Sequence, residues 1–354
     1  MRLERRTRAS APAIVAASLG AVVFTLAVSA LLVMAAGAPV GRTYLLLLQG
    51  GFGSVFAWSE TLTRAVPLIF TGLAAAVAFR ARLFNIGAEG QLYAGALAAV
   101  AIGGMHDGSG LDWPIWLLFP AMLAAAALAG ALLLLGPALM KRFLGVDEVV
   151  TTLLLNFIVL LAVSALLDGP MKDPTAMGWP QSVALQDGLS LGQLLPQTRL
   201  HNGLLGGCGL ALVLWLVMQR ARLGFDIRAV GANSRAAAFA GVPVTRTVVL
   251  VAMLSGALAG LGGAVEVAGR TGYLTLDMSP GYGYTGIVIA MLAALHPLGV
   301  VAAAVFTAGV LVGADSMSRA VGVPSAIADV IVATSLLAVL VASLASQYRV
   351  RWKA

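Results

Sequence analysis

The chain has 354 residues, of which 60% are hydrophobic and only 10% are charged, and its mean hydropathy is +0.95. A soluble domain carries roughly 25% charged residues, so this chain cannot cover a globule of its size with polar surface. The composition predicts a polytopic membrane protein and excludes soluble enzymes and secreted disulfide scaffolds. The net charge of +7 is spread between apolar runs rather than gathered in a patch, so no nucleic-acid partner is expected. The single cysteine, Cys208, cannot form an intrachain disulfide.

A membrane-spanning helix needs about 20 apolar residues, and fewer where it is short or broken. By this rule we mark ten apolar runs, at about 12–36, 64–79, 86–105, 113–140, 149–167, 203–219, 246–266, 284–296, 298–314 and 326–346. The first run is longer than the apolar core of a signal peptide, so we interpret it as a retained anchor. His296-Pro297 separates two short runs and fits either a tight turn or a re-entrant pair. We therefore expect an all-α polytopic fold of about ten segments, forming one transmembrane domain over residues 1–354.

The lysines and arginines predict the orientation, because cytoplasmic loops carry an excess of them. With a cytoplasmic N-terminus and ten alternating spans, sixteen basic residues lie inside and six lie outside. Both termini are then cytoplasmic, and the basic tail at 348–353 favours an even number of spans. The chain is expected to be a multi-pass protein of the cell membrane.

Two segments between apolar runs are long enough to have a role of their own. The extracytoplasmic loop at about 168–202 contains four prolines and Trp179. The cytoplasmic loop at about 219–245 contains a capping residue, Asn233, then helix formers, then Gly241. This pattern predicts a short surface helix at about 233–240. The alternative interpretation is an ordinary basic inner loop.

Motifs for catalysis are missing from the sequence. There is no GxxxxGK[ST] loop for phosphates, no HExxH, no paired histidine or cysteine ligands and no GxSxG. We therefore expect no catalytic residue, no metal site and no cofactor bound by this chain. Transport, with its chemistry supplied by another subunit, is the leading class of function.

Polar side chains at membrane depth are costly, so each is a candidate site residue. Asn85, Glu89 and Gln91 lie with two glycines at the start of the third apolar run and predict a broken helix entry. They are candidates for the substrate path, although Glu89 could instead pair with Arg80 or Arg82. Asn156 lies inside the fifth run, where an amide bonds either a neighbouring helix or a substrate.

Two further segments are glycine-rich. Tyr282 and Tyr284 in GYGYTG could stack on a ring-bearing ligand or anchor the helix at the membrane interface. The run SGALAGLGG at 255–263 has GxxxG spacing, which predicts close packing of helix backbones.

The segment LFNIGAEGQ at 83–91, the stretch Thr151–Asn156 ahead of Asp168-Gly169-Pro170, and the inner loop from Gly231 to Val242 resemble one family. This is the permease subunit of bacterial ABC importers for nucleosides, within the superfamily of ribose and branched-chain amino acid permeases. The similarity covers about residues 15–345, and the motifs follow one another in the same order as in the family. FNIGAEGQ is the more specific motif, whereas the inner loop indicates an importer permease in general.

The resemblance implies several partners and a location in the bacterial inner membrane. A second permease subunit, usually a paralogue, would share the translocation path, and an extracytoplasmic lipoprotein would deliver the solute. A cytoplasmic ATPase, using ATP and Mg, would bind the short inner helix. The residues expected to couple the chain to that ATPase are Arg228, Gly231, Asn233, Arg235 and Gly241.

Three alternatives remain at this point. The same architecture could import a simple sugar or another small metabolite, since a sugar needs nearly the same polar groups. An ion-coupled secondary transporter would also have broken helices, at 85–91 and 281–286, but few buried carboxylates are available for coupling. An intramembrane enzyme is disfavoured because the sequence contains no catalytic constellation.

Overall fold

The structure is a computed structural model that describes residues 2–5, 11–105, 111, 113–322 and, after these, 330, 333–334, 337–338, 341–342 and 348–351. The chain forms two compact units, one of residues 62–305 and the other of residues 1–61 with 306–354. We describe each unit by itself.

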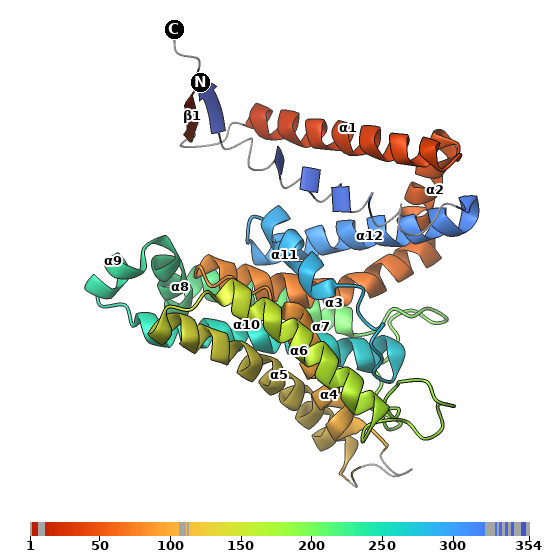
Figure 1. The fold of residues 1–354 in the computed structure, drawn as a ribbon, viewed down its shortest axis with the longest axis vertical. Coiled ribbons are helices and arrows are strands. Elements are labelled where there is room, and N and C mark those ends of the chain that lie inside the picture. The colour runs from red at the N-terminus through yellow and green to blue at the C-terminus, as the bar shows by residue number, and fades with distance from the viewer. Residues whose placement is uncertain are drawn as a thin grey trace. The chain divides into compact units, whose positions relative to one another are not determined.

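Residues 62–305 form a helical bundle that holds all the candidate site residues (Figure 1). It begins within α3 (Val55–Arg80) and ends within α12 (Pro297–Val321). Between them lie α4 (Ala88–Gly103), α5 (Ile115–Leu139), the π-helical turn η2 (Met140–Leu144), α6 (Glu148–Asp168), α7 (Gly203–Arg220), α8 (Arg222–Ala232), α9 (Ser234–Phe239), α10 (Val244–Glu266), the π-helical turn η3 (Val267–Thr271) and α11 (Tyr282–Leu292).

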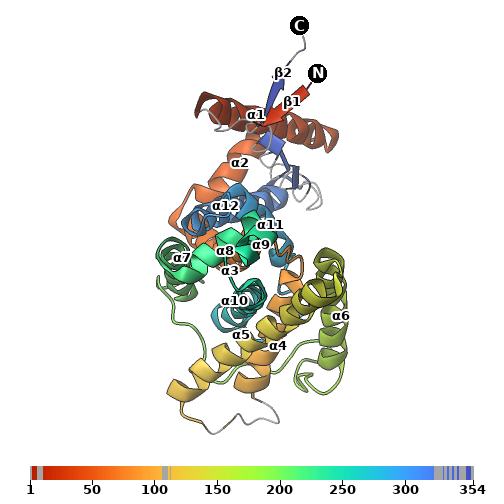
Figure 2. The ribbon, with the colours of Figure 1, turned by 90° about the vertical axis from the view of Figure 1, so that its left-hand side faces the viewer.

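The centre of this unit is α10, which packs most extensively on α5 and α4 (Figure 2). Glycines make this approach possible. A Cβ on Gly256 would overlap the carbonyl oxygen of Gly130 on α5, and a Cβ on Gly95 of α4 would overlap that of Gly260. The helices thus touch through their backbones, which confirms the packing predicted from GxxxG spacing at 255–263.

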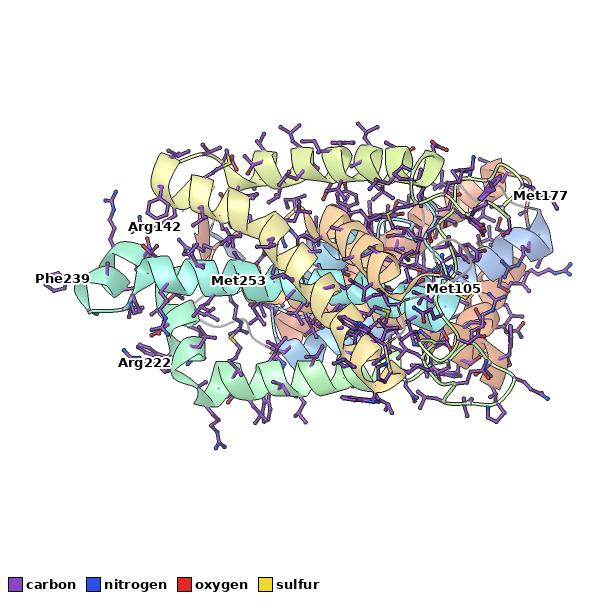
Figure 3. All side chains as sticks on the ribbon, turned by 90° about the horizontal axis from the view of Figure 1, so that it is seen from below. Met105, Arg142, Met177, Arg222, Phe239 and Met253 are labelled. Carbon is purple, nitrogen blue, oxygen red and sulfur yellow. The ribbon has the colours of Figure 1, made fainter. Side chains whose placement is uncertain are left out.

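The two ends of this unit differ in character (Figure 3). Arg142, Arg222 and Phe239 lie at one end, which we call the basic end and define by the C-termini of α3, α5 and α7 with helices α8 and α9. Met105 and Met177 lie at the other, the loop end, which contains the long loop at about 168–202.

Isolated β-bridges tie the loop end together, pairing Gly104 with Leu185, Gln181 with Thr275, and Gln193 with His201. His201 is buried there, and its Nδ1 accepts the N–H of Gly203 at 3.2 Å. Burial, reinforced by the positive charge of Arg270, lowers the pKa of His201 to about 4. The imidazole is therefore neutral at physiological pH.

The other unit contains α1 (Ala11–Ala35), α2 (Val40–Phe52), the first turns of α3 and most of α12. A Cβ on Gly51 of α2 would overlap the carbonyl oxygen of Gly309 on α12, so these helices also meet through their backbones. Two short strands, β1 (Arg2–Arg5) and β2 (Tyr348–Arg351), pair in antiparallel fashion and bring the two ends of the chain together.

Six helices among the described residues are long and apolar enough to cross a membrane, or seven if α1 and α2, bent by 116°, form one span. The helix α2 was not expected, and α3 begins at Val55 rather than near residue 64. Thr61 and Thr63 interrupt the apolar pattern there, but both are buried inside the fold, so the helix continues through them. The run expected at 326–346 falls largely outside the described residues.

The short runs near the end of the bundle are now distinguished by length. With 11 residues, α11 rises about 17 Å, roughly half of the hydrocarbon core. With 25 residues, α12 is long enough to cross. Between them, residues 293–296 connect the two helices, and the carbonyl of Leu295 accepts a hydrogen bond from Nε of Arg80 at 3.1 Å.

Candidate functional site

The predicted break before the third apolar run is present, since residues 81–87 leave the helical conformation between α3 and α4. Asn85 organises it. Its side-chain oxygen accepts the N–H of Gly87 at 2.9 Å, and its amide pairs reciprocally with the amide of Gln91, both bonds being 2.9 Å. Asn85 also donates to Oγ of Ser255 on α10, which in turn donates to the carbonyl of Ala74 on α3. Three helices are thereby joined at the break.

One face of α6 holds the non-helical segment in place. Glu148 and Thr152 lie four residues apart, and Asn156 follows at the same spacing, so the three side chains share a face of the helix. They accept, in order, the N–H groups of Phe84 (3.1 Å), Ile86 (3.2 Å) and Gly90 (2.8 Å). Backbone groups freed by the break are thus satisfied by protein rather than by water.

Asn156 makes two further hydrogen bonds. Its amide nitrogen donates to the carbonyl of Ile86 at 2.9 Å and to the hydroxyl of Tyr284 at 3.1 Å. The segment at 85–91 and Tyr284 of the segment at 281–286 are therefore connected through α6. Glu148 and Thr152 were missed in the sequence, although a polar residue at every fourth position of an apolar run is the pattern that marks such a face.

Glu89 joins α4 to α11. Its Oε2 accepts the N–H of Gly283 at 2.6 Å and its carboxylate also contacts the Ser279 hydroxyl. A carboxylate in the first turn of a helix is favourable because the N–H groups there have no partner within the helix. One turn along α4, the hydroxyl of Tyr93 donates to the carbonyl of Leu276, which fixes the loop before α11.

Tyr282 belongs to a second polar group nearer the loop end. Its hydroxyl accepts a hydrogen bond from Arg270 at 3.0 Å, and Arg270 also forms an ion pair of 2.6 Å with the buried Glu266. Its backbone carbonyl accepts the hydroxyl of Thr71 on α3 at 2.9 Å. Tyr282 is thus held through its hydroxyl by Arg270 and through its carbonyl by Thr71.

Burial separates the six residues predicted for the substrate path. Asn85, Glu89, Gln91, Asn156 and Tyr282 are each at most 3% exposed, whereas Tyr284 is 38% exposed. The first five support the broken helix and its neighbours. Tyr284 is the member that presents a surface, and it is hydrogen-bonded to the core of the network through Asn156. Contact between these residues and a solute stays a prediction.

The short helix predicted in the inner loop is present as α9, at the basic end. Asn233 caps its start, with Oδ1 accepting the N–H groups of Arg235 at 3.0 Å and Ala236 at 3.1 Å. Gly241 ends it in the left-handed conformation, with φ of 81°. The N–H of Val242 donates a hydrogen bond back to the carbonyl of Ala237 at 2.9 Å, which completes the hydrogen bonding at the C-terminal end of the helix.

Two of the other expected coupling residues, Arg228 and Gly231, lie on α8, a helix that was not expected. Gly231 packs on the end of α3, where a Cβ would overlap the carbonyl oxygen of Arg80. Arg228 donates to the carbonyl of Met218, so its guanidinium is directed toward the end of α7. Arg235 is exposed on α9. Whether these residues contact an ATPase stays a prediction.

Phe239 is the most prominent residue that sequence reasoning missed. It is 97% exposed and projects from the end of α9, away from the bundle (Figure 3). A large aromatic ring on a polar loop is the signal that could have identified it, because such residues anchor protein interfaces.

Among the residues that the structure describes, no group of three or more His, Cys, Asp or Glu side chains is placed to hold a metal ion. The candidate site is therefore built of amides, carboxylates, hydroxyls and backbone groups.

Comparisons with known proteins identify the family of this chain. The family described as "Branched-chain amino acid transport system / permease component" matches residues 57–340. The guanosine ABC transporter permease NupP of Bacillus subtilis is 35% identical, over 94% of this chain and 93% of the relative. The glucose ABC transporter permease TsgB13 of Haloferax volcanii is 38% identical over 84% and 79% of the two chains, and the nucleoside ABC transporter permease NupB of Lactococcus lactis is 30% identical over 91% and 89%.

These matches favour a transport subunit over the ion-coupled transporter and the intramembrane enzyme. The family match spans both the broken helix at 81–87 and the capped helix α9, and the three relatives named are similar over most of their own length. The chain belongs to the family of branched-chain amino acid transport system permease components, as an ABC transporter permease that spans the membrane.

Proposed function

We propose that this chain forms the translocation path for nucleosides in an ATP-driven importer, while a separate subunit binds Mg and hydrolyses ATP. The observation that carries the importer assignment is α9. It is a helix of six residues, closed by Asn233 at one end and Gly241 at the other, with Phe239 exposed at its tip. A short, rigid helix that displays an aromatic anchor is suited to insertion into a groove of the ATPase.

Movement of α9 has a direct route into the bundle. Asn233 joins α9 to α8 without an intervening loop, and Gly231 of α8 rests on the last turn of α3. On its other side, α9 leads through Pro243 into α10. Both α3 and α10 contribute to the network around Asn85, through Ala74 and Ser255. A displacement of α9 by the ATPase would therefore reach the broken helix.

The basic end of the bundle faces the cytoplasm in this proposal, in accord with the excess of lysine and arginine on cytoplasmic segments. Ten membrane segments and two cytoplasmic termini complete the topology. The antiparallel pairing of β1 with β2 supports the even number of segments, because it brings the two ends of the chain side by side. The loop at 168–202 would then face the solute-binding lipoprotein outside the bacterial inner membrane.

We favour nucleosides as the solute because permeases named for guanosine and nucleosides are similar to this chain over most of its length. The network also fits a neutral solute with a ring, since Tyr284 presents an aromatic face and a hydroxyl beside the Asn156 amide. A simple sugar is the second candidate, supported by the 38% identity to the glucose permease. The expected substrate-path residues remain Asn85, Glu89, Gln91, Asn156, Tyr282 and Tyr284.

A paralogous permease is the proposed partner in the membrane. Two different guanosine permeases of Bacillus subtilis, NupP and NupQ, are both similar to this chain, at 35% and 28% identity. Such a pair would form when two related subunits each contribute half of the path. The ATPase would bind α9, with Arg228, Gly231, Asn233, Arg235 and Gly241 as the coupling residues.

The test of this function begins with co-expression of the chain with its candidate partners and purification in mild detergent. We expect an ATPase subunit to co-purify, and its activity to rise when nucleoside and binding lipoprotein are added together. Purification of the chain without any ATPase would overturn the importer assignment. Stimulation by glucose but not by uridine or guanosine would replace the nucleoside by a sugar.

The coupling role of α9 has a matched pair of variants. Gly241→Val strains the end of α9, where φ is 81°, whereas Gly145→Val imposes the same kind of strain at φ of 68° beside η2, outside the coupling loop. A Cβ added at either position meets no other atom within 4 Å. We expect Gly241→Val to abolish stimulation of the ATPase and Gly145→Val to retain it, with both proteins inserted in the membrane. Equal stimulation in the two variants would exclude the coupling role.

A further inference from the structure

A hollow of about 390 Å³ lies at the basic end and is lined on one side by residues of α9. Four basic residues line it, namely Arg82 after α3, Lys141 and Arg142 on η2, and Arg235 on α9. Ser234 adds a hydroxyl. The residues come from separate elements, so the fold assembles this concentration of positive charge.

The charges in this hollow are only partly neutralised by the protein. Lys141 forms an ion pair with Glu148 and donates to the carbonyl of Arg82 at 2.7 Å. Among the described residues, this is the one ion pair that any of the four basic residues makes. Arg142 uses Nε to bond the Thr245 hydroxyl at 2.9 Å, which leaves the outer nitrogens of its guanidinium for a ligand. Like charges gathered in this way repel unless an anion joins them.

The donors in this hollow select a phosphate group among anions. Guanidinium groups present planar pairs of N–H donors that match phosphate oxygens, and Arg82, Arg142 and Arg235 each supply one. The remaining wall is apolar and includes Leu83, Val244 and Val248. A hydrated ion makes no favourable contact with that apolar wall. The glycerol and upper acyl carbons of a lipid, in contrast, would remove the wall from water.

We propose that this hollow binds a phosphate group, supplied by the head group of an anionic phospholipid. The position of the hollow at the ends of α3 and α10 places it at the level of lipid head groups, where basic pockets between helices bind such lipids. A phosphate held there contacts α9 through Arg235 and the bundle through Arg82 and Arg142. The lipid therefore fixes the angle of α9 against the bundle. The inference is independent of which solute is carried.

The experiment is native mass spectrometry of the full chain, delipidated in detergent and titrated with dioleoyl phosphatidylglycerol or dioleoyl phosphatidylcholine. We expect the wild-type chain to retain phosphatidylglycerol at roughly tenfold lower concentration than phosphatidylcholine. The double variant Arg82→Gln/Arg142→Gln should lose this preference. The matched control Arg222→Gln/Arg246→Gln removes two exposed arginines of the same end that do not line the hollow, and it should keep the preference.

Thermal unfolding in detergent without lipid checks that both double variants fold alike, and Arg82→Lys/Arg142→Lys is the substitute if the glutamine pair does not fold. Equal loss of preference in both double variants would overturn the proposal, because it would show attraction to net charge alone. Displacement of phosphatidylglycerol by millimolar inorganic phosphate would assign the hollow to the free ion and overturn the lipid source. Unchanged lipid binding in Arg82→Gln/Arg142→Gln, with loss of the ATPase on purification, would assign the hollow to an acidic protein surface instead.

Discussion

The side-chain oxygen of Asn156 on α6 lies 2.8 Å from the backbone nitrogen of Gly90 on α4, and a Cβ on Gly90 would lie 2.9 Å from that same oxygen. This hydrogen bond therefore requires a residue without a side chain at position 90. The two helices approach closely enough for the side-chain amide of one to accept a backbone N–H of the other.

The variant Asn156→Ala should lower stability. It leaves the buried N–H of Gly90 and the partly buried carbonyl of Ile86 without a partner, and the buried N–H alone costs about 1–3 kcal/mol. Thermal unfolding in detergent measures the loss, and the exposed Asn202→Ala serves as control. Uptake, counted per folded molecule, should also fall for Asn156→Ala and Glu89→Ala. Unchanged uptake per folded molecule in both would restrict these residues to a structural role.

A more direct test of solute contact is Tyr284→Phe, because Tyr284 is the exposed member of the network. Loss of the hydroxyl removes its hydrogen bond with Asn156 while the ring remains. We expect the KM for nucleoside uptake to rise about tenfold, with little change in stability. Tyr273→Phe is the matched control, since Tyr273 is also 38% exposed. An equal KM in the two variants would remove Tyr284 from the substrate path.

The variant Gly283→Ala should separate α4 from α11. A Cβ there would overlap the backbone nitrogen of Glu89, and no change of rotamer relieves overlap with a backbone atom. We expect a loss of stability of roughly 1–3 kcal/mol or more. Gly209→Ala, on α7, meets no atom within 4 Å and should leave the unfolding temperature unchanged or higher. Similar behaviour of the two alanines would show that the contact between α4 and α11 is looser than described.

Phe239→Ala should impair coupling without disturbing the bundle. The ring is 97% exposed, so its removal costs no packing within this chain, whereas an aromatic anchor at an interface contributes about 2 kcal/mol or more. We expect at least a tenfold weaker association with the ATPase, measured by co-purification and titration. Phe143→Ala is the control, because Phe143 is 68% exposed on η2, near the same end. Wild-type association of Phe239→Ala would show that the anchor lies elsewhere on α9.

The pH dependence of stability should reveal His201. Its pKa is about 4 in the folded chain, below the ordinary 6.5, so between these values the unfolded chain binds a proton that the folded chain does not. The contribution of His201 to stability is therefore fully present above pH 6.5 and is lost as the pH drops toward 4. Unfolding temperatures of wild type and His201→Gln across this range provide the measurement. The variant should have the flatter profile, and an equal slope in the two proteins would contradict the role of His201.

The apolar pattern was sufficient to predict helices and a broken entry before α4, but it could not predict which polar residues share a partner. Asn85 and Gln91 are close in sequence, so their pairing is local. Ser255 is 170 residues from Asn85, and its place beside the break depends on how α10 packs. The same limit explains why Glu148 and Thr152 were missed, since their role depends on the chain that lies against α6.

Predicted helix boundaries were wrong where polar residues are buried inside the fold. Thr61 and Thr63 interrupted the apolar run and shifted the expected start of α3, although both are buried in the structure. The caps of α9 were predicted correctly because Asn233 and Gly241 act on their own neighbours in sequence. Short-range chemistry is thus readable along the chain, whereas the tertiary network is not.

The backbone contacts of Gly256 with Gly130 and of Gly95 with Gly260 have a mechanical consequence. Side chains between two helices can change rotamer and let the helices slide, but touching peptide groups have no such freedom. We therefore expect α4, α5 and α10 to move as one rigid wedge during transport. Opening and closing would then be left to the parts of the bundle that are not joined to this wedge through such peptide contacts.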